Sequence, residues 1–377
     1  MLKNLKKKLA VSFQDWKFAI YVMHLVNGIA GGLVGIFIPI YFLTLGYSLS
    51  QIFIFFIVNN FAILLFSLTA SWFAKQFGLV KTLLLRLVFL FLNLFLLYNL
   101  KTLPNSFYLI SVLSAAEIAF YWFTVHVVFA KSSEIESIGE HVGKLAVIPK
   151  MASLVSPLLG AGITALFGFR ALFLFAGGAF LVSVVPFLLI EKIPLEVKLN
   201  FHGVVDYIKR YKKYFVAEFL MSIPGEIEGF VLPIFLFLTF RDVLSVGFLA
   251  TCLALGGVVL TLLVGKYSDR VSRKTFMRIG SVVLIAAWLG MYLANNQLSF
   301  YGLSGIIGFF GALVFVPFSS IFYINAKNNH VEDFVIFREL PISLGRILLY
   351  VTALFLLTNI KLTFLFSSLP FLFFLFY

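Results

Sequence analysis

The stretch GIFIPI at residues 35–40 is nearly repeated as GFVLPI at residues 229–234, and each copy lies within a long apolar run. Two further similarities follow in the same order along the chain: Ala130-Lys131 recurs as Ala326-Lys327, and Lys150 corresponds to Arg346. Matches that keep one offset indicate internal duplication. The repeat therefore predicts two copies of one structural unit.

The composition indicates the class of protein. Hydrophobic residues make up 62% of the chain and charged residues only 12%, with a mean hydropathy of +1.05. So little polar surface cannot solvate a soluble globule, and an apolar run of about 20 residues spans a membrane as a helix. We predict an all-α integral membrane protein with twelve transmembrane helices, at residues 18–45, 51–73, 82–100, 106–129, 145–167, 171–190, 214–239, 243–264, 279–294, 298–324, 334–358 and 362–377.

The positive charges indicate how these helices are oriented. The net charge is +13, which in a soluble protein would suggest nucleic acid as a partner. Most basic residues, however, fall in the alternate loops that twelve helices would place in the cytoplasm, Lys75, Lys81, Arg86 and Arg338 among them. The opposite loops contain only Lys101, Arg170, Arg241 and Lys361. We therefore expect both termini in the cytoplasm and no nucleic-acid partner.

The longest hydrophilic connection divides the chain into two pseudo-symmetric halves of six helices. We expect residues 1–190 to form the first half, residues 191–213 a cytoplasmic linker, and residues 214–377 the second half. From Phe201 the linker has apolar residues at helical spacing, with basic residues between them. This pattern predicts an amphipathic helix at the membrane surface.

The loop between the eighth and ninth predicted helices carries a motif, GKYSDRVSRK, at residues 265–274. It resembles the conserved loop motif of the major facilitator superfamily, whose overall organisation also agrees with the predicted helices and linker. The resemblance implies secondary transport by alternating access and a bridging role for Asp269, which would meet the cytoplasmic start of the fifth helix near Lys144. The alternative is that the cluster only sets topology. The motif residues are Gly265, Asp269, Arg270, Arg273 and Lys274.

Two other stretches match family patterns in part. Residues 71–81 occupy the equivalent loop of the first half, but Lys75 stands where the family has Asp, so a latch on both sides is not expected. Residues 152–161 are similar to a signature of proton-coupled drug antiporters, with Ser and Ala in place of two glycines. Small residues at this spacing also pack helices in any membrane protein.

Ionisable residues within membrane helices are costly and are candidates for function. Four are candidates for proton coupling: His24, Glu117, Glu226 and Glu228. Glu226 and Glu228 follow Pro224-Gly225 and differ by about 200° around a helix, so at most one of them can face a narrow cavity unless the backbone breaks locally. Each could equally be neutralised by a basic partner such as Arg346 or Lys150.

Five further residues are candidates for the wall of a substrate cavity: Asn27, Tyr121, Trp122, Lys150 and Arg346. With 48 phenylalanines in the chain, most aromatic residues are expected to face lipid or other helices. Lys150 and Arg346 are interpreted as counter-charges for carboxylates or as contacts for an anion.

The sequence thus predicts a secondary transporter, coupled to protons and acting as a monomer in the plasma (cell inner) membrane. Export of an amphipathic or hydrophobic compound is slightly favoured over uptake of a small metabolite or movement of a lipid-like molecule. A non-transporting receptor or a membrane-embedded enzyme is the alternative from another class. The five histidines show no metal-ligand spacing and there is no nucleotide-binding glycine loop, so we expect no enzyme activity, metal or cofactor.

Overall fold

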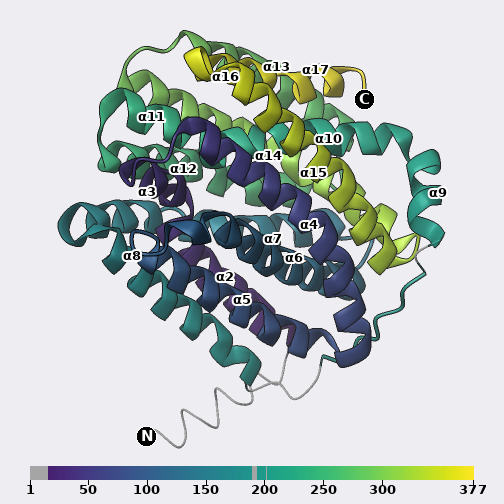
Figure 1. Ribbon diagram of the computed structural model, residues 1–377. Coiled ribbons are helices and arrows are strands. Elements are labelled where there is room, and N and C mark those ends of the chain that lie inside the picture. The colour runs from purple at the N-terminus through teal and green to yellow at the C-terminus, as the bar shows by residue number, and fades with distance from the viewer. Residues whose placement is uncertain (1–15, 189–192, 201) are drawn as a thin grey trace, which may run out of the picture.

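The computed structural model describes residues 16–188, 193–200 and 202–377, and in these ranges every regular element is helical (Figure 1). The lysines of the N-terminal tail, Lys3, Lys6, Lys7 and Lys8, lie outside the described residues, as do Glu191, Lys192 and Phe201 of the linker. The helices before the linker are α2 (Trp16–Val34), η1 (Gly35–Phe37), α3 (Ile38–Thr44), α4 (Leu49–Phe77), α5 (Leu79–Asn99), η2 (Pro104–Ser106), α6 (Phe107–Ser132), α7 (Ile138–Ala152) and α8 (Ser156–Leu188). We call these elements together the N-segment.

The linker contains α9 (His202–Arg210), which is the amphipathic helix predicted there. The following elements form what we call the C-segment: α10 (Lys212–Glu226), η3 (Ile227–Val231), α11 (Leu232–Phe240), α12 (Val243–Tyr267), α13 (Arg273–Leu293), α14 (Gln297–Lys327), α15 (Val331–Phe355), η4 (Leu357–Leu362), α16 (Thr363–Phe366) and α17 (Leu369–Leu375). In Figure 1, α9 lies at one end of the bundle, and α3 and α11 lie at the other.

Ten helical stretches within the described residues are long and apolar enough to cross a membrane. One of them, Ile138–Ser183, contains both the fifth and the sixth predicted helices, and Gly168 interrupts it with a positive φ of 78°. The eleventh predicted helix corresponds to α15, which is not among the ten because Glu332, Asp333, Arg338, Glu339 and Arg346 interrupt its apolar sequence. The protein is an all-helical multi-pass membrane protein, and the number twelve stays a prediction.

The repeated GIFIPI and GFVLPI stretches mark matching irregularities in two helices. A 3-10 turn, η1, separates α2 from α3 just before Pro39, and a π-helical turn, η3, separates α10 from α11 just before Pro233. Proline has no backbone N–H and therefore cannot bond to the carbonyl four residues earlier. The repeat thus breaks two long helices at equivalent positions, and the break in the second lies beside the candidate acids.

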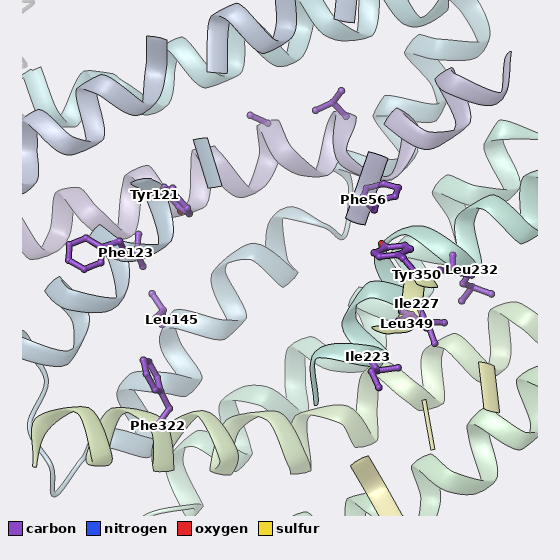
Figure 2. Close-up of a cluster of buried hydrophobic side chains, with 14 of the residues drawn as sticks. Phe56, Tyr121, Phe123, Leu145, Ile223, Ile227, Leu232, Phe322, Leu349 and Tyr350 are labelled. Carbon is purple, nitrogen blue, oxygen red and sulfur yellow. The ribbon is translucent and has the colours of Figure 1, made fainter. Parts of the chain in front are cut away.

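The N-segment and the C-segment pack along two principal seams. On one seam α7 and α8 contact α12, and α7 also contacts α14; on the other, α4 contacts α15. Gly143 and Gly265 allow the first seam to close, since a Cβ at Gly265 would lie 2.9 Å from the Cα of Gly143. On the second seam the rings of Phe56 and Tyr350 stack with centroids 5.0 Å apart, as Figure 2 shows.

Large apolar side chains cover much of the outside of the bundle. Phe355 is 83% exposed, Leu298 is 80% exposed and Leu166 is 78% exposed. A soluble protein rarely exposes so much contiguous apolar surface. This surface suits lipid, and it leaves the interior of the bundle as the place for polar chemistry.

Candidate functional site

A cavity of about 590 Å³ lies between the two segments. The N-segment contributes residues of α2, η1, α6, α7 and α8, and the C-segment contributes residues of α10, η3, α12, α13, α14, α15 and α17. Most of its wall is apolar, including Ile36, Leu253, Ile307, Phe315, Phe318 and Phe322. Its volume is within the range of sites that bind small molecules.

Of the predicted site residues, His24, Trp122, Lys150, Glu228 and Arg346 line this cavity. Glu218, Arg338, His126 and Tyr323 line it too, although the sequence did not single them out as cavity residues. The other predicted candidates, Asn27, Glu117, Tyr121 and Glu226, are not part of its wall. The structure therefore brings together about half of the predicted set and adds a second group of ionisable residues.

Two cations of α15 are each held by a carboxylate of α10. Arg338 Nε donates to Glu218 Oε1 at 2.7 Å. Arg346 Nε lies 3.0 Å from Glu226 Oε1, and the Tyr350 hydroxyl donates to Glu226 Oε2 at 2.5 Å. Because each arginine has its own counter-charge, neither adds a net charge to the cavity.

Lys150 and Glu228 are arranged differently. Lys150 Nζ donates to Thr261 Oγ1 of α12 at 3.0 Å, so a lysine of the N-segment reaches the C-segment. Among the described residues, neither Lys150 nor Glu228 has an oppositely charged group within 4.0 Å, and no hydrogen bond to the Glu228 carboxylate occurs. One positive and one negative group, contributed by opposite segments, thus share the cavity without a direct bond.

Local structure explains the positions of these two groups. Lys150 fits because residue 257 is glycine: a Cβ there would lie 2.7 Å from Lys150 Nζ. Glu228 lies in the π-helical turn η3, after Pro224 and Gly225 in the cavity wall. Glu228 lines the cavity, whereas Glu226 does not and contacts Tyr350 and the wall residue Arg346.

A second polar cluster is buried within the N-segment. Arg86 Nε donates to Glu117 Oε1 at 2.6 Å, and the Arg86 guanidinium also donates to the Asn27 side chain. The same guanidinium lies over the Tyr121 ring, 4.2 Å from its centroid, and the Tyr121 hydroxyl is 2.5 Å from His24 Nδ1. Only His24 of this cluster reaches the cavity wall.

Arg86 and Arg338 correct the sequence interpretation, which counted both among the cytoplasmic charges that set topology. Arg86 is only 2% exposed, and Arg338 lines the cavity. The signal that could have identified them was position, because both fall within predicted helices, at 82–100 and 334–358. Each is stabilised in the interior by a carboxylate, Glu117 or Glu218, that lies on another helix.

The loop motif closes one end of the α7–α12 seam. Asp269 Oδ1 accepts from the backbone N–H of Gly139 at 3.0 Å, and Oδ2 accepts from that of Glu140 at 3.2 Å, so Asp269 caps the first turn of α7. Arg273 Nη2 bonds Asp269 Oδ1 at 2.9 Å, whereas Arg270 and Lys274 are exposed. Lys144 does not contact Asp269; it pairs with Glu140 at 2.6 Å.

A bundle of apolar helices that encloses a cavity with ionisable residues in its wall, between two packed segments, is the architecture of a membrane transporter. The chain belongs to the Major Facilitator Superfamily, because the model of that family matches residues 20–214 and again residues 214–377. It is accordingly a transporter of a small-molecule substrate and not an enzyme.

Solved structures of transporters share this fold. The human organic anion transporter MFSD10 (TETRAN) is 15% identical with a TM-score of 0.64, and the match covers 95% of this chain and 97% of that one. The transporter FucP in its outward conformation is 11% identical with a TM-score of 0.68, covering 97% and 98%. A variant of the E. coli fucose:proton symporter FucP is 11% identical with a TM-score of 0.70, also covering 97% and 98%. Comparison with curated proteins gives no match.

Proposed function

We propose that the protein is a proton-coupled secondary transporter that moves an amphipathic small molecule by alternating access. The observation that carries this proposal is that Lys150 of α7 and Glu228 of η3 line the same cavity and carry opposite charges without a direct bond to each other. A buried carboxylate without a direct partner is poised to take up or release a proton. Because the counter-charge of Glu228 is Lys150 of the other segment, a change in the charge of Glu228 affects the contact between the segments.

The four predicted proton-coupling residues receive different roles in this proposal. Glu228 exchanges the transported proton. His24 lies in the same wall and connects the cavity to Tyr121. Glu117 and Glu226 neutralise Arg86 and Arg346 and thereby position them.

We also propose that the chain forms twelve transmembrane helices in two halves, with both termini in the cytoplasm. The protein would lie in the plasma membrane of the cell. The two matches of the family model, which meet at residue 214, support a division at the linker. The bonds of Asp269 to the first turn of α7 support closure of the cytoplasmic end of the seam. The proposal of a functional monomer is supported by the cavity, whose described wall is formed by residues of a single chain.

Two observations bear on direction. The partial antiporter signature at residues 152–161 favours export of an amphipathic or hydrophobic compound. The Lys150 cation in the wall, which has no ionic partner in contact, favours the second candidate, uptake of a metabolite with an anionic group. Movement of a lipid-like molecule is the remaining alternative.

Proteoliposomes containing the purified protein and an internal pH indicator test this proposal. Compounds of matched size that are anionic, neutral or cationic are added outside, and the resulting internal pH change is recorded. We expect a pH change with at least one charge class for the parent protein and for Glu140→Gln, whose carboxylate is exposed on α7. Glu228→Gln should abolish the change. A response that is equal in Glu228→Gln and in the parent would contradict proton coupling at this residue.

A further inference from the structure

We propose that the substrate is an amphipathic organic anion, that its acidic group binds at Lys150, and that it enters the cavity together with one proton, which binds to Glu228. This inference rests on the proposed transport function and adds the charge of the substrate and the direction of the proton relative to it.

Most charged groups of the cavity wall are balanced by a partner in contact. Arg338 is balanced by Glu218, and Arg346 by Glu226. His126 is held between Tyr323 and Arg338: its Nδ1 lies 2.8 Å from the Tyr323 hydroxyl, and its Nε2 lies 3.1 Å from Arg338 Nη1. His24 bonds Tyr121.

Lys150 and Glu228 are therefore the charged groups of the described wall that have no ionic partner in contact. Their charges still attract each other across the cavity. The charged groups of the described wall and their direct partners consequently sum to zero net charge, with Glu228 as the distant counter-charge of Lys150.

Substrates of different charge would change the net charge of the cavity in different ways. A bound anion replaces Glu228 as the counter-charge of Lys150, so the Glu228 carboxylate loses its attraction and takes a proton from water. The loaded cavity then contains the Lys150 ammonium, the substrate anion and a neutral Glu228, and is again neutral. A substrate cation would add a positive charge beside Lys150, and like charges repel each other strongly in an interior with little water.

The site combines an ammonium group held in place with a mostly apolar wall. Lys150 Nζ already bonds Thr261 on α12 and lies against Gly257, so its ammonium is held between the two segments. Apolar side chains of both segments, such as Ile36 and Leu253, form other parts of the same wall. A molecule with one acidic group and an apolar body matches this combination of a mostly apolar surface and a lysine that, among the described residues, has no ionic partner in contact.

The experiment uses three compounds with the same apolar body: 4-phenylbutyrate, 4-phenylbutan-1-ol and 4-phenylbutylamine. Binding to the full chain in lipid nanodiscs is measured by titration calorimetry in buffers with different ionisation enthalpies, which reports the protons taken up. We expect the carboxylate to bind at least tenfold more tightly than the alcohol or the amine, with uptake of one proton. In the alkaline range the Kd of 4-phenylbutyrate should rise about tenfold per pH unit, as the uptake of one linked proton requires.

Variants locate the effect. Lys150→Met should weaken carboxylate binding at least tenfold, whereas Lys144→Met, on the same helix but paired with Glu140 at the surface, should leave it unchanged. Glu228→Gln should keep binding the carboxylate while losing both the proton uptake and the pH dependence. Thr261→Val tests the ammonium's position without removing its charge and should weaken binding severalfold.

Tighter binding of the amine than of the carboxylate, carboxylate binding without proton uptake, or absence of binding by the carboxylate would each overturn the inference. Loss of 4-phenylbutyrate binding in Glu228→Gln would also overturn the inference, because that result would make the Glu228 side chain itself a contact for the ligand. If the neutral or cationic compound alone produces a pH change in proteoliposomes, the transport function stands and only the charge assignment fails.

Discussion

At the scale of single residues, the position of Lys150 depends on the absence of a side chain at residue 257. Gly257→Ala would place a Cβ 2.7 Å from Lys150 Nζ and 3.0 Å from its Cδ. The flexible lysine can move aside, so we expect the variant to fold. The displaced ammonium should weaken 4-phenylbutyrate binding severalfold and leave the proton count per bound anion unchanged. Calorimetry on the variant measures both quantities, and unchanged affinity would contradict the assigned position of the ammonium.

Arg86 gives a second prediction at this scale. Arg86→Met would leave the carboxylate of Glu117 buried without its cation, and loss of one partner of a buried pair costs about 3–5 kcal/mol. The variant should unfold at a clearly lower temperature in detergent. The double variant Arg86→Met/Glu117→Gln should recover most of that loss, because no charge remains unpaired. A double variant as unstable as the single one would argue against the pair.

These residues also show what the sequence could not reveal. The candidates His24, Lys150, Glu228 and Arg346 were identifiable because an ionisable residue in an apolar run stands out. The partners could not be assigned, since the choice of Glu117 for Arg86 and of Glu226 for Arg346 depends on how α5, α6, α10 and α15 pack. The sequence therefore predicts which residues are costly to bury but not which of them share a cavity.

At the scale of helices and loops, Asp269 joins the two segments through the first turn of α7. Asp269→Ala removes the acceptors for the N–H groups of Gly139 and Glu140, and loss of such a cap costs about 1 kcal/mol. We expect a lower unfolding temperature and a shift of the transporter away from the state in which this seam is closed. Cysteine accessibility at the inner end of the α7–α12 seam measures that shift, with exposed Arg270→Ala as the control. Equal accessibility in both variants would refute the bridging role.

The start of α12 provides a pH-dependent prediction. Partial burial raises the pKa of Asp242, but hydrogen bonds from the Ser245 side chain and the backbone of Leu244 and Ser245 outweigh it and lower the pKa below its usual range. A carboxylate with a lowered pKa stabilises the folded state above its unfolded pKa of about 3.9, and this contribution is lost as pH falls through the folded value.

Asp242→Asn keeps a side-chain oxygen that can cap the helix and removes only the charge, so it should reduce stability near neutral pH by less than the about 1 kcal/mol that loss of a cap costs. The difference between parent and variant should shrink as the pH falls below about 4. Thermal unfolding of both proteins between pH 3 and 7 measures this difference. A difference that stays constant across the range would show that the ionised carboxylate is not the source of the stabilisation.

Helix positions were largely predictable, because apolar runs and the linker pattern report them directly. The irregularities were only partly so. The repeat around Pro39 and Pro233 predicted a duplicated structure but no helix break, and the 3-10 turn in one helix and the π-helical turn in the other follow from packing around each. Gly168, which separates the fifth and sixth predicted helices, left only a short gap in the hydropathy pattern.

At the scale of the whole molecule, the duplicated scaffold carries unlike chemistry in its two parts. The N-segment contributes Lys150 and a buried cluster around Arg86, whereas the C-segment contributes Glu218, Glu228 and both arginines of α15. In the proposed function, the packing of the two segments serves the rocking motion of alternating access, and their different charges make the cavity between them sensitive to protons.

The central claim is that proton coupling resides at Glu228, which faces the other segment, and not at Glu117, which is paired within its own segment. The most direct test measures protons moved per substrate molecule in proteoliposomes, using the compound that evokes the largest pH change in the parent. We expect Glu117→Gln to lower the amount of folded protein but to keep the number of protons moved per substrate molecule. Glu228→Gln should reduce that number to zero. A lost ratio in Glu117→Gln together with a normal ratio in Glu228→Gln would contradict the account.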